Sequence, residues 1–184
     1  MASHEVVELP VYPTSSEEFR RLARPVILPE PGAGPGLTFT PAFDGFTIGT
    51  GRLVDISHLY IPPLPDPLGV ELHRPLMDRH LDSEEVWVVL RGDLVMGMAE
   101  SEEDPLGIPS VKDFRLFYIR QGETFVLPAA RWHGGIWGAA PNTPAEFLMF
   151  LSGHRSDQSG RRVDHVMESY PEDVAIVPSK NLPK

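Results

Sequence analysis

The sequence predicts a single all-β domain, a sandwich or barrel with one short helix near its N-terminus. Many short segments alternate apolar and polar residues at the two-residue period of a strand, and Gly, Pro, Asp or Asn bound most of them. Only one stretch shows helical spacing, and many short strands with one helix are typical of all-β architectures. With 184 residues and 41% apolar content, the chain can bury one ordinary core.

The single helix is predicted over residues 14–23. The stretch TSSEE at residues 14–18 offers hydroxyl groups for an N-cap and acidic residues for the first turn. Phe19, Leu22 and Ala23 then supply an apolar face at helical spacing, and Pro25 ends the helix. Residues 28–37 hold three prolines and three glycines, which indicates a surface connection into the body of the fold.

The expected strands divide the chain into three regions. We expect an N-terminal strand, helix and linker over residues 1–37, a β-sandwich over 38–153 and a C-terminal extension over 154–184. Apolar residues in the extension predict a short helix or strand that docks on the sandwich or on a second subunit. The strands are predicted at Thr38–Pro41, Phe46–Leu53, Leu59–Ile61, Val70–Leu76, Glu85–Leu90, Asp93–Met98, Arg115–Ile119, Thr124–Leu127, His133–Trp137 and Glu146–Leu151.

Charge and composition exclude several classes of partner. The net charge of -10 would repel a phosphate backbone or an anionic lipid surface, so we expect no nucleic-acid or membrane partner. The N-terminal residues lack the cationic start and apolar centre of a secretory signal, which predicts a cytoplasmic protein. The chain has no cysteine, so disulfides, thiolate zinc sites and thiol nucleophiles are excluded. The acidic run at residues 100–105 is interpreted as a solvated loop.

Two short stretches carry the residues whose side chains could bind a metal or a substrate. The first runs from Asp78-Arg79-His80 through Glu85 to Gly92, and the second runs from Gly122 and Pro128 to Ala130-Arg131-Trp132-His133. Imidazole and carboxylate at such intervals are ligands for a borderline divalent cation. The glycines and the proline indicate turns that would bring two separate strand pairs together.

Strand parity predicts that the two stretches meet. Alternate residues face the same side of a strand, which groups His80 with Asp78, Leu76 and Arg74, and Glu85 with Trp87. By the same argument His133 shares a face with Arg131 and Trp137. His80, Glu85 and His133 would then form a polar trio inside an apolar sandwich, where unpaired groups cost several kcal/mol. A metal, a substrate or one another must satisfy them, and imidazoles more than about 8 Å apart would exclude a shared cation.

The two stretches resemble the paired motifs of the cupin superfamily, which implies a single-domain cupin β-sandwich or jelly-roll barrel. His80, Glu85 and Gly92 match the first motif, and Gly122, Pro128 and His133 match the second. Asp78 stands where the first motif has a histidine, Ala130 replaces a glycine, and Trp137 replaces the usual Asn.

A closer resemblance is to the ureidoglycolate lyase family, single-cupin enzymes of purine and allantoin catabolism that release urea and glyoxylate from ureidoglycolate. The stretches Asp78-Arg79-His80 and Trp132-His133 carry it, together with the predicted N-terminal helix. The family usually has Glu rather than Asp78, Gln rather than Glu85, and a second histidine where Gly134 stands. The resemblance implies a carbon–nitrogen lyase acting on a small carboxylate.

The implied chemistry assigns a role to each candidate residue. His80, Glu85 and His133 would hold a divalent metal (Ni, Mn or Zn), with Asp78 as a fourth ligand or as the base. Arg131 or Arg79 would pair the substrate carboxylate, and Arg131 is preferred because it shares parity with His133. Trp87 and Trp137 would form the pocket wall.

Two other functions fit the same residues. One is a cupin module that binds a sugar or small acid without turnover, which would be favoured if internal arginines engaged Asp78 and Glu85. The other is a metal-dependent cupin isomerase or oxygenase. A homodimer is expected from an exposed sheet edge and the apolar C-terminal segment. His58 and His73 are expected at edges or on the surface, and His4, His154 and His165 in solvent near the mobile ends of the chain.

Overall fold

The computed structural model describes residues 5–26, 54–100, 107–152, 158–159, 164–170, 174–179 and 182–183. Within these ranges the protein is built of strands, with one short α-helix and one 3-10 turn. The elements are β1 (Glu5–Leu9), β2 (Val11–Pro13), α1 (Glu17–Leu22), β3 (Arg24–Val26), β4 (Val54–Ile61), β5 (Leu72–His73), β6 (Leu76–His80), β7 (Glu85–Arg91), β8 (Leu94–Ala99), η1 (Val111–Asp113), β9 (Arg115–Ile119), β10 (Thr124–Leu127), β11 (Trp132–Gly138), β12 (Ala145–Ser152), β13 (His165–Ser169) and β14 (Val174–Pro178).

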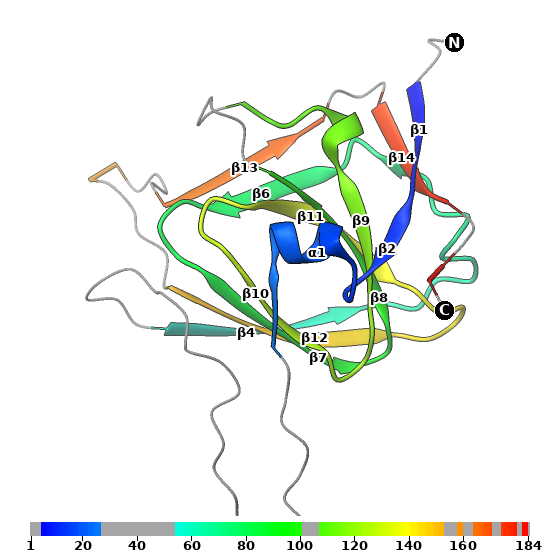
Figure 1. The fold of residues 1–184 in the computed structure, drawn as a ribbon, viewed down its shortest axis with the longest axis horizontal. Coiled ribbons are helices and arrows are strands. Elements are labelled where there is room, and N and C mark those ends of the chain that lie inside the picture. The colour runs from blue at the N-terminus through cyan, green and yellow to red at the C-terminus, as the bar shows by residue number, and fades with distance from the viewer. Residues whose placement is uncertain are drawn as a thin grey trace, which may run out of the picture.

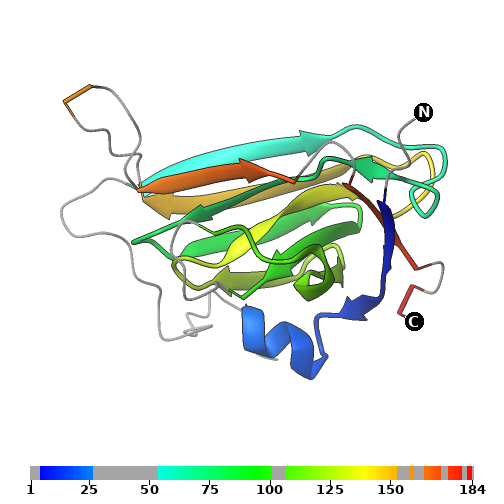
Figure 2. The ribbon, with the colours of Figure 1, turned by 90° about the horizontal axis from the view of Figure 1, so that it is seen from above.

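Two large sheets face each other, and a small sheet lies beside one of them. The five-stranded sheet has the order β3-β10-β7-β12-β4, and the six-stranded sheet has the order β13-β6-β11-β8-β9-β2. The third sheet has the order β1-β14-β5. Figure 1 shows β4, β12 and β7 along one side of the molecule and β13, β6 and β11 along the other, while Figure 2 shows the layers from above. The predicted all-β sandwich with a short N-terminal helix is confirmed.

The six-stranded sheet is covered on both faces. Its inner face packs against the five-stranded sheet in a core that includes Trp87, Met96 and Phe147. Its outer face packs in a second core that includes Val95, Trp132 and residues of β1 and β14. All six residues of β8 are consequently buried, although a sheet with one solvated face would alternate. The two cores explain how so short a chain holds its polar cluster away from water.

The helix forms as predicted. Ser16 is its N-cap and accepts a hydrogen bond from the backbone N–H of Phe19 at 3.1 Å. Phe19 and Leu22 are buried and belong to the inner core, so α1 covers one end of the space between the large sheets. No helix in the described ranges has the length and apolarity that a membrane crossing requires.

Most predicted strands agree with the structure, and one is broken. Arg115–Ile119 and Thr124–Leu127 have the predicted bounds, whereas the single strand predicted at Val70–Leu76 is wrong. Arg74 has a φ of 48°, and Pro75 follows it, so the chain turns between β5 and β6. Arg74 therefore does not share a strand face with His80. The predicted strands at residues 38–41 and 46–53 lie outside the described residues.

The ends of the chain contribute strands to the sheets. β1 pairs in parallel with β14, β2 pairs with β9, β3 pairs with β10, and β13 pairs with β6. The bounds 1–37, 38–153 and 154–184 remain a prediction, but residues from both ends pack against the central strands. The C-terminal extension in particular brings β13 beside the strand that carries Asp78 and His80.

Candidate functional site

Three strands from the two facing sheets bring the predicted residues together. Asp78 and His80 lie on β6 and His133 lies on β11, in the six-stranded sheet, whereas Glu85 lies on β7 in the opposite sheet. The register pairs His133 directly with Asp78 across β11 and β6. The residues 81–84 carry the chain from one sheet to the other, so Glu85 faces His80 across the interior.

The side chains of the trio are buried and converge. The His133 Nε2 atom lies 2.9 Å from Asp78 Oδ1 and 3.5 Å from Glu85 Oε2, and His80 Nε2 lies 3.9 Å from Glu85 Oε1. The imidazole centroids of His80 and His133 are 6.3 Å apart, below the limit that would exclude a shared cation. The side chains of His80, Glu85 and His133 are at most 5% exposed, whereas that of Asp78 is 30% exposed. Solvent therefore reaches the cluster on the side of Asp78.

The structure adds a residue that sequence reasoning placed in solvent. His165 lies on β13, opposite His80 in the register, and its side chain is buried. Its Nε2 atom lies 3.1 Å from Asp78 Oδ2, and its ring stacks on that of His80 with centroids 4.6 Å apart. The expectation of a solvated His165 is wrong. The alternation of His165 and Met167 could have indicated a strand, but nothing local identifies β6 as its partner.

The wall of the cluster is aromatic. Trp87 lies edge-on to His133, with ring centroids 5.7 Å apart, and its Nε1–H donates to Glu85 Oε2 at 3.2 Å. Phe125 and Phe147 stack on the Trp87 indole, with ring centroids 5.9 and 4.7 Å away, and restrict its orientation. The structure thus places Trp87 beside Glu85, as the parity argument predicted, and also beside His133. A low-polarity wall of this kind strengthens electrostatic interactions inside the cluster.

Burial and neighbouring charges shift the pKa values of three groups. Burial opposes ionisation of Asp78, but the imidazoles of His133 and His165 outweigh it and hold the pKa of this carboxyl well below 3.8. Burial raises the pKa of Glu85 above its ordinary 4.5, although His133 opposes the change. Burial disfavours the imidazolium of His133, yet Glu85 and Asp78 raise its pKa to about 10. Without a cation, a proton on His133 therefore balances the charge of Asp78.

The donor set fits a divalent cation. Two ligands that bind one ion through bonds of about 2.1 Å lie roughly 3.0 to 3.4 Å apart, close to the distances from His133 Nε2 to Asp78 and Glu85. The Nδ1 atom of His133 lies 3.0 Å from the backbone oxygen of Arg131, which orients Nε2 toward the cluster. A metal-binding histidine commonly uses its second nitrogen in this way. His80, Glu85, His133 and Asp78 are thus arranged to hold such an ion.

Trp137 lies on the other face of β11. The register between β11 and β8 shifts between Gly134 and Trp137, where a bulge adds one residue to β11. Trp137 consequently pairs with Val95 and joins the outer core, and its Nε1–H donates to the backbone oxygen of Pro67 at 3.0 Å. The expectation that Trp137 points inward with His133 is wrong, because an extra residue reverses the parity of every later position.

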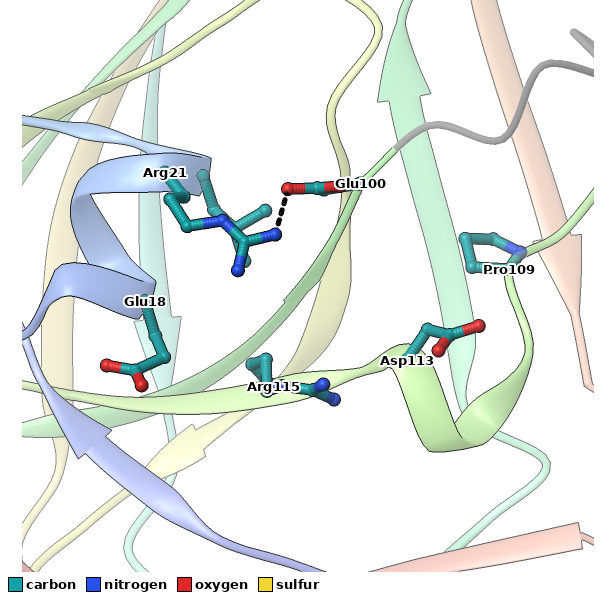
Figure 3. A pocket seen from close by; sticks show the side chains of 7 residues that line it. Glu18, Arg21, Glu100, Pro109, Asp113 and Arg115 are labelled. Carbon is teal, nitrogen blue, oxygen red and sulfur yellow. Dashed lines mark hydrogen bonds and ion pairs between the residues drawn. The ribbon is translucent and has the colours of Figure 1, made fainter.

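Of the two arginines proposed for substrate binding, Arg79 lies away from the trio. Arg79 is buried on the outer face of β6, with its guanidinium carbon 4.4 Å from the centre of the Trp132 ring. Burial lowers the pKa of Arg131, and the charges that act on it are those of Glu100 and Arg21. Those two residues form an ion pair at 2.8 Å in a polar cavity of about 270 Å³ (Figure 3). The outer position of Arg79 agrees with the parity argument, and the inward position of Arg131 stays a prediction.

Comparisons with known proteins give structural similarities alone. No protein-family model and no curated protein matches the chain. Oxalate decarboxylase from Lactobacillus farciminis is 18% identical over 62% of this chain and 26% of its own, with a TM-score of 0.38. A dTDP sugar isomerase from Desulfovibrio desulfuricans is 17% identical over 82% of both chains, with a TM-score of 0.41. The chain thus spans about a quarter of the length of the oxalate decarboxylase.

Proposed function

We propose that the chain is a small cupin enzyme of the ureidoglycolate lyase type, which eliminates urea from ureidoglycolate or acts on a related small carboxylate. The observation that carries the proposal is the convergence of Asp78, His80, Glu85 and His133 from three strands in an apolar interior. Burying so many ionisable groups together costs free energy and serves no packing purpose. Such clusters, in which the pKa of one carboxyl group is lowered and that of another is raised, as for Asp78 and Glu85, are typical of catalytic sites.

The elimination needs no oxidant and consumes no water. The hydroxyl of ureidoglycolate loses its proton, its C–O bond becomes the carbonyl of glyoxylate, and the C–N bond breaks with its electron pair on urea, which takes up a proton. The carboxylates of Asp78 and Glu85 offer proton acceptors, and the imidazoles of His80 and His133 offer donors. If a divalent cation is instead bound by His80, Glu85 and His133, it would polarise the hydroxyl and the carboxylate, and Asp78 would serve as a fourth ligand or as the base.

The exposure of the cluster favours a small substrate. Among the described residues, the cluster is open to solvent on the side of Asp78, and the exposed side chains of Leu76 and Met167 share that face of β6 and β13. A substrate entering there meets Asp78 first and the trio behind it. Arg79 is buried on the opposite face of β6, so a substrate carboxylate would be held by the cation or by an imidazole.

The experiment is an assay of the purified chain with ureidoglycolate. We expect urea and glyoxylate in equal amounts above the spontaneous background, with manganese, nickel or zinc supplied. His80→Ala and Glu85→Ala should each lower the rate by roughly 100-fold or more, the scale of a lost acid–base or electrostatic group. His58→Ala is the matched control, because His58 is exposed and pairs with Glu146 on β12. Folded parent protein that forms no glyoxylate above background with any of the metals rules out the lyase assignment.

A non-catalytic binding module is the second candidate. It is favoured by the ion pair between His133 and Asp78, which neutralises the centre of the cluster without a cation or substrate. The feature expected of such a module, arginines engaging Asp78 and Glu85, is not seen among the described contacts, which join them to histidines and Trp87. Saturable binding of small acids without product formation would identify the module.

A further inference from the structure

His165 contacts the candidate metal site from a part of the chain that neither motif covers. β13 runs antiparallel to β6 with His165 opposite His80, and on this face the next residue of β13 is Met167, opposite Asp78. The side chain of His165 is 6% exposed. The C-terminal extension therefore delivers a buried imidazole to the edge of the cluster.

The Asp78 carboxylate is shared between two imidazoles. Its Oδ1 atom lies 2.9 Å from Nε2 of His133, and its Oδ2 atom lies 3.1 Å from Nε2 of His165. Both distances fit neighbouring ligands of one ion with bonds of about 2.1 Å. One potential ligand atom each from Asp78, His80 and His165 also lie within 4.8 Å of one another. Because ligands on opposite sides of such an ion lie about 4.2 Å apart, small side-chain movements would bring all three onto it.

We propose that His165 is a ligand of this site and supplies a third imidazole beside His80 and His133. The proposal rests on the proposed function, because it assumes that a cation binds among Asp78, Glu85 and these histidines. Two carboxylates balance the charge of one divalent ion, and three neutral imidazoles complete its donors without adding charge. An imidazole-rich set of this kind selects borderline cations such as Zn²⁺, Ni²⁺ or Co²⁺ over Mg²⁺ and Ca²⁺.

The alternative role for His165 is to hold Asp78 by a hydrogen bond. The two roles differ in what a glutamine can replace. The amide of glutamine can donate a hydrogen bond to Asp78 Oδ2, but it is a poor ligand for a borderline cation. His165→Gln therefore preserves a positioning role and removes a ligand, whereas His165→Ala removes both. His58→Ala is the matched control on the exposed face of β4.

The test measures cation binding to the metal-free full-length chain. Zn²⁺ affinity is determined by competition with a chromophoric chelator, Mg²⁺ is titrated in parallel, and pulsed electron paramagnetic resonance of bound Cu²⁺ counts imidazole ligands. We expect the parent to prefer Zn²⁺ and to show three imidazoles. Both His165 variants should show two and should lose more than the roughly 10–100-fold in affinity that an outer-shell partner costs. His58→Ala should match the parent.

Three results would overturn the proposal. They are a His165→Gln variant with the parent's affinity and imidazole count, a parent that prefers Mg²⁺, and a parent that binds no cation. Circular dichroism and urea denaturation establish whether each variant is folded. If His165→Ala unfolds, His165→Gln still tests the proposal, because its amide can keep the hydrogen bond to Asp78. The lyase assignment is decided by urea and glyoxylate formation in the parent, so either proposal can fail while the other holds.

Discussion

His133 and Asp78 face each other across β11 and β6, with His133 Nε2 2.9 Å from Asp78 Oδ1. Glu85 approaches the same nitrogen at 3.5 Å from the opposite sheet. A single imidazole thus links the two large sheets through two carboxylates. Because His133 and Glu85 are removed from bulk water and Asp78 is only partly exposed, each depends on the others or on a bound cation for its charge balance.

The first prediction concerns cation binding. His133→Ala should abolish stoichiometric binding of a divalent metal, because it removes the donor nearest to both carboxylates. It should also lower the free energy of unfolding by about 3 kcal/mol, since Asp78 and Glu85 lose their shared partner. Elemental analysis and urea denaturation measure the two effects, with His58→Ala as the control. Equal metal content in variant and parent would contradict the shared site.

The second prediction is the pH dependence of stability in the metal-free protein. The pKa of His133 is raised from 6.5 to about 10, so its contribution to stability is complete below pH 6.5 and is lost as the pH rises through 10. The pKa of Asp78 is lowered, so its contribution is present above pH 3.8 and is lost in acid. Urea denaturation between pH 6 and pH 10 should show a decline in the parent that His133→Gln lacks.

Nitrogen NMR of the histidine rings provides the independent readout. We expect the His133 signal to keep the position of a charged imidazolium at pH 8, where an unperturbed imidazole is neutral. A His133 signal that titrates near pH 6.5 would show that the carboxylates do not hold the proton.

The third prediction concerns the bulge that follows His133. A Cβ atom at Gly134 would lie 2.4 Å from the backbone oxygen of Leu76, and the residue has a φ of 152°. Gly134→Ala should therefore separate β11 from β6 and destabilise the protein by more than the 1–3 kcal/mol of backbone strain alone. Gly122→Ala is the matched control, because Gly122 has a φ of 86° with no atom within 4 Å of the added Cβ. Equal losses in thermal denaturation would contradict the steric argument.

The fourth prediction separates stability from substrate binding at Arg79. The guanidinium lies over the Trp132 ring in the outer core, and a desolvated pair of this kind contributes about 2 kcal/mol. Arg79→Ala should lower the free energy of unfolding by at least that amount. Arg24→Ala is the control, because its ion pair with Glu84 is solvent-exposed and should contribute at most about 1 kcal/mol. A stable Arg79→Ala protein with a raised KM would instead place Arg79 at the substrate.

The sequence by itself determined several strands, the helix and four of the residues that meet at the site, Asp78, His80, Glu85 and His133. Alternation and turn residues defined β9 and β10, the N-cap defined α1, and strand parity put His80 and Asp78 on one face and Arg79 on the other. These features are local, because side-chain period and capping depend on residues within a few positions of each other. Parity also placed Trp87 with Glu85.

The tertiary structure decided the side-chain orientations and strand pairings that the local sequence pattern could not predict. The bulge in β11 turns Trp137 to the outer core, and Arg74 breaks a strand at a left-handed backbone position. The pairing of β13 with β6 brings His165 to Asp78 across 87 residues of sequence. Each outcome depends on register or on contacts between distant strands, which are set by the free energy of the whole packed core and not by the period of any one segment.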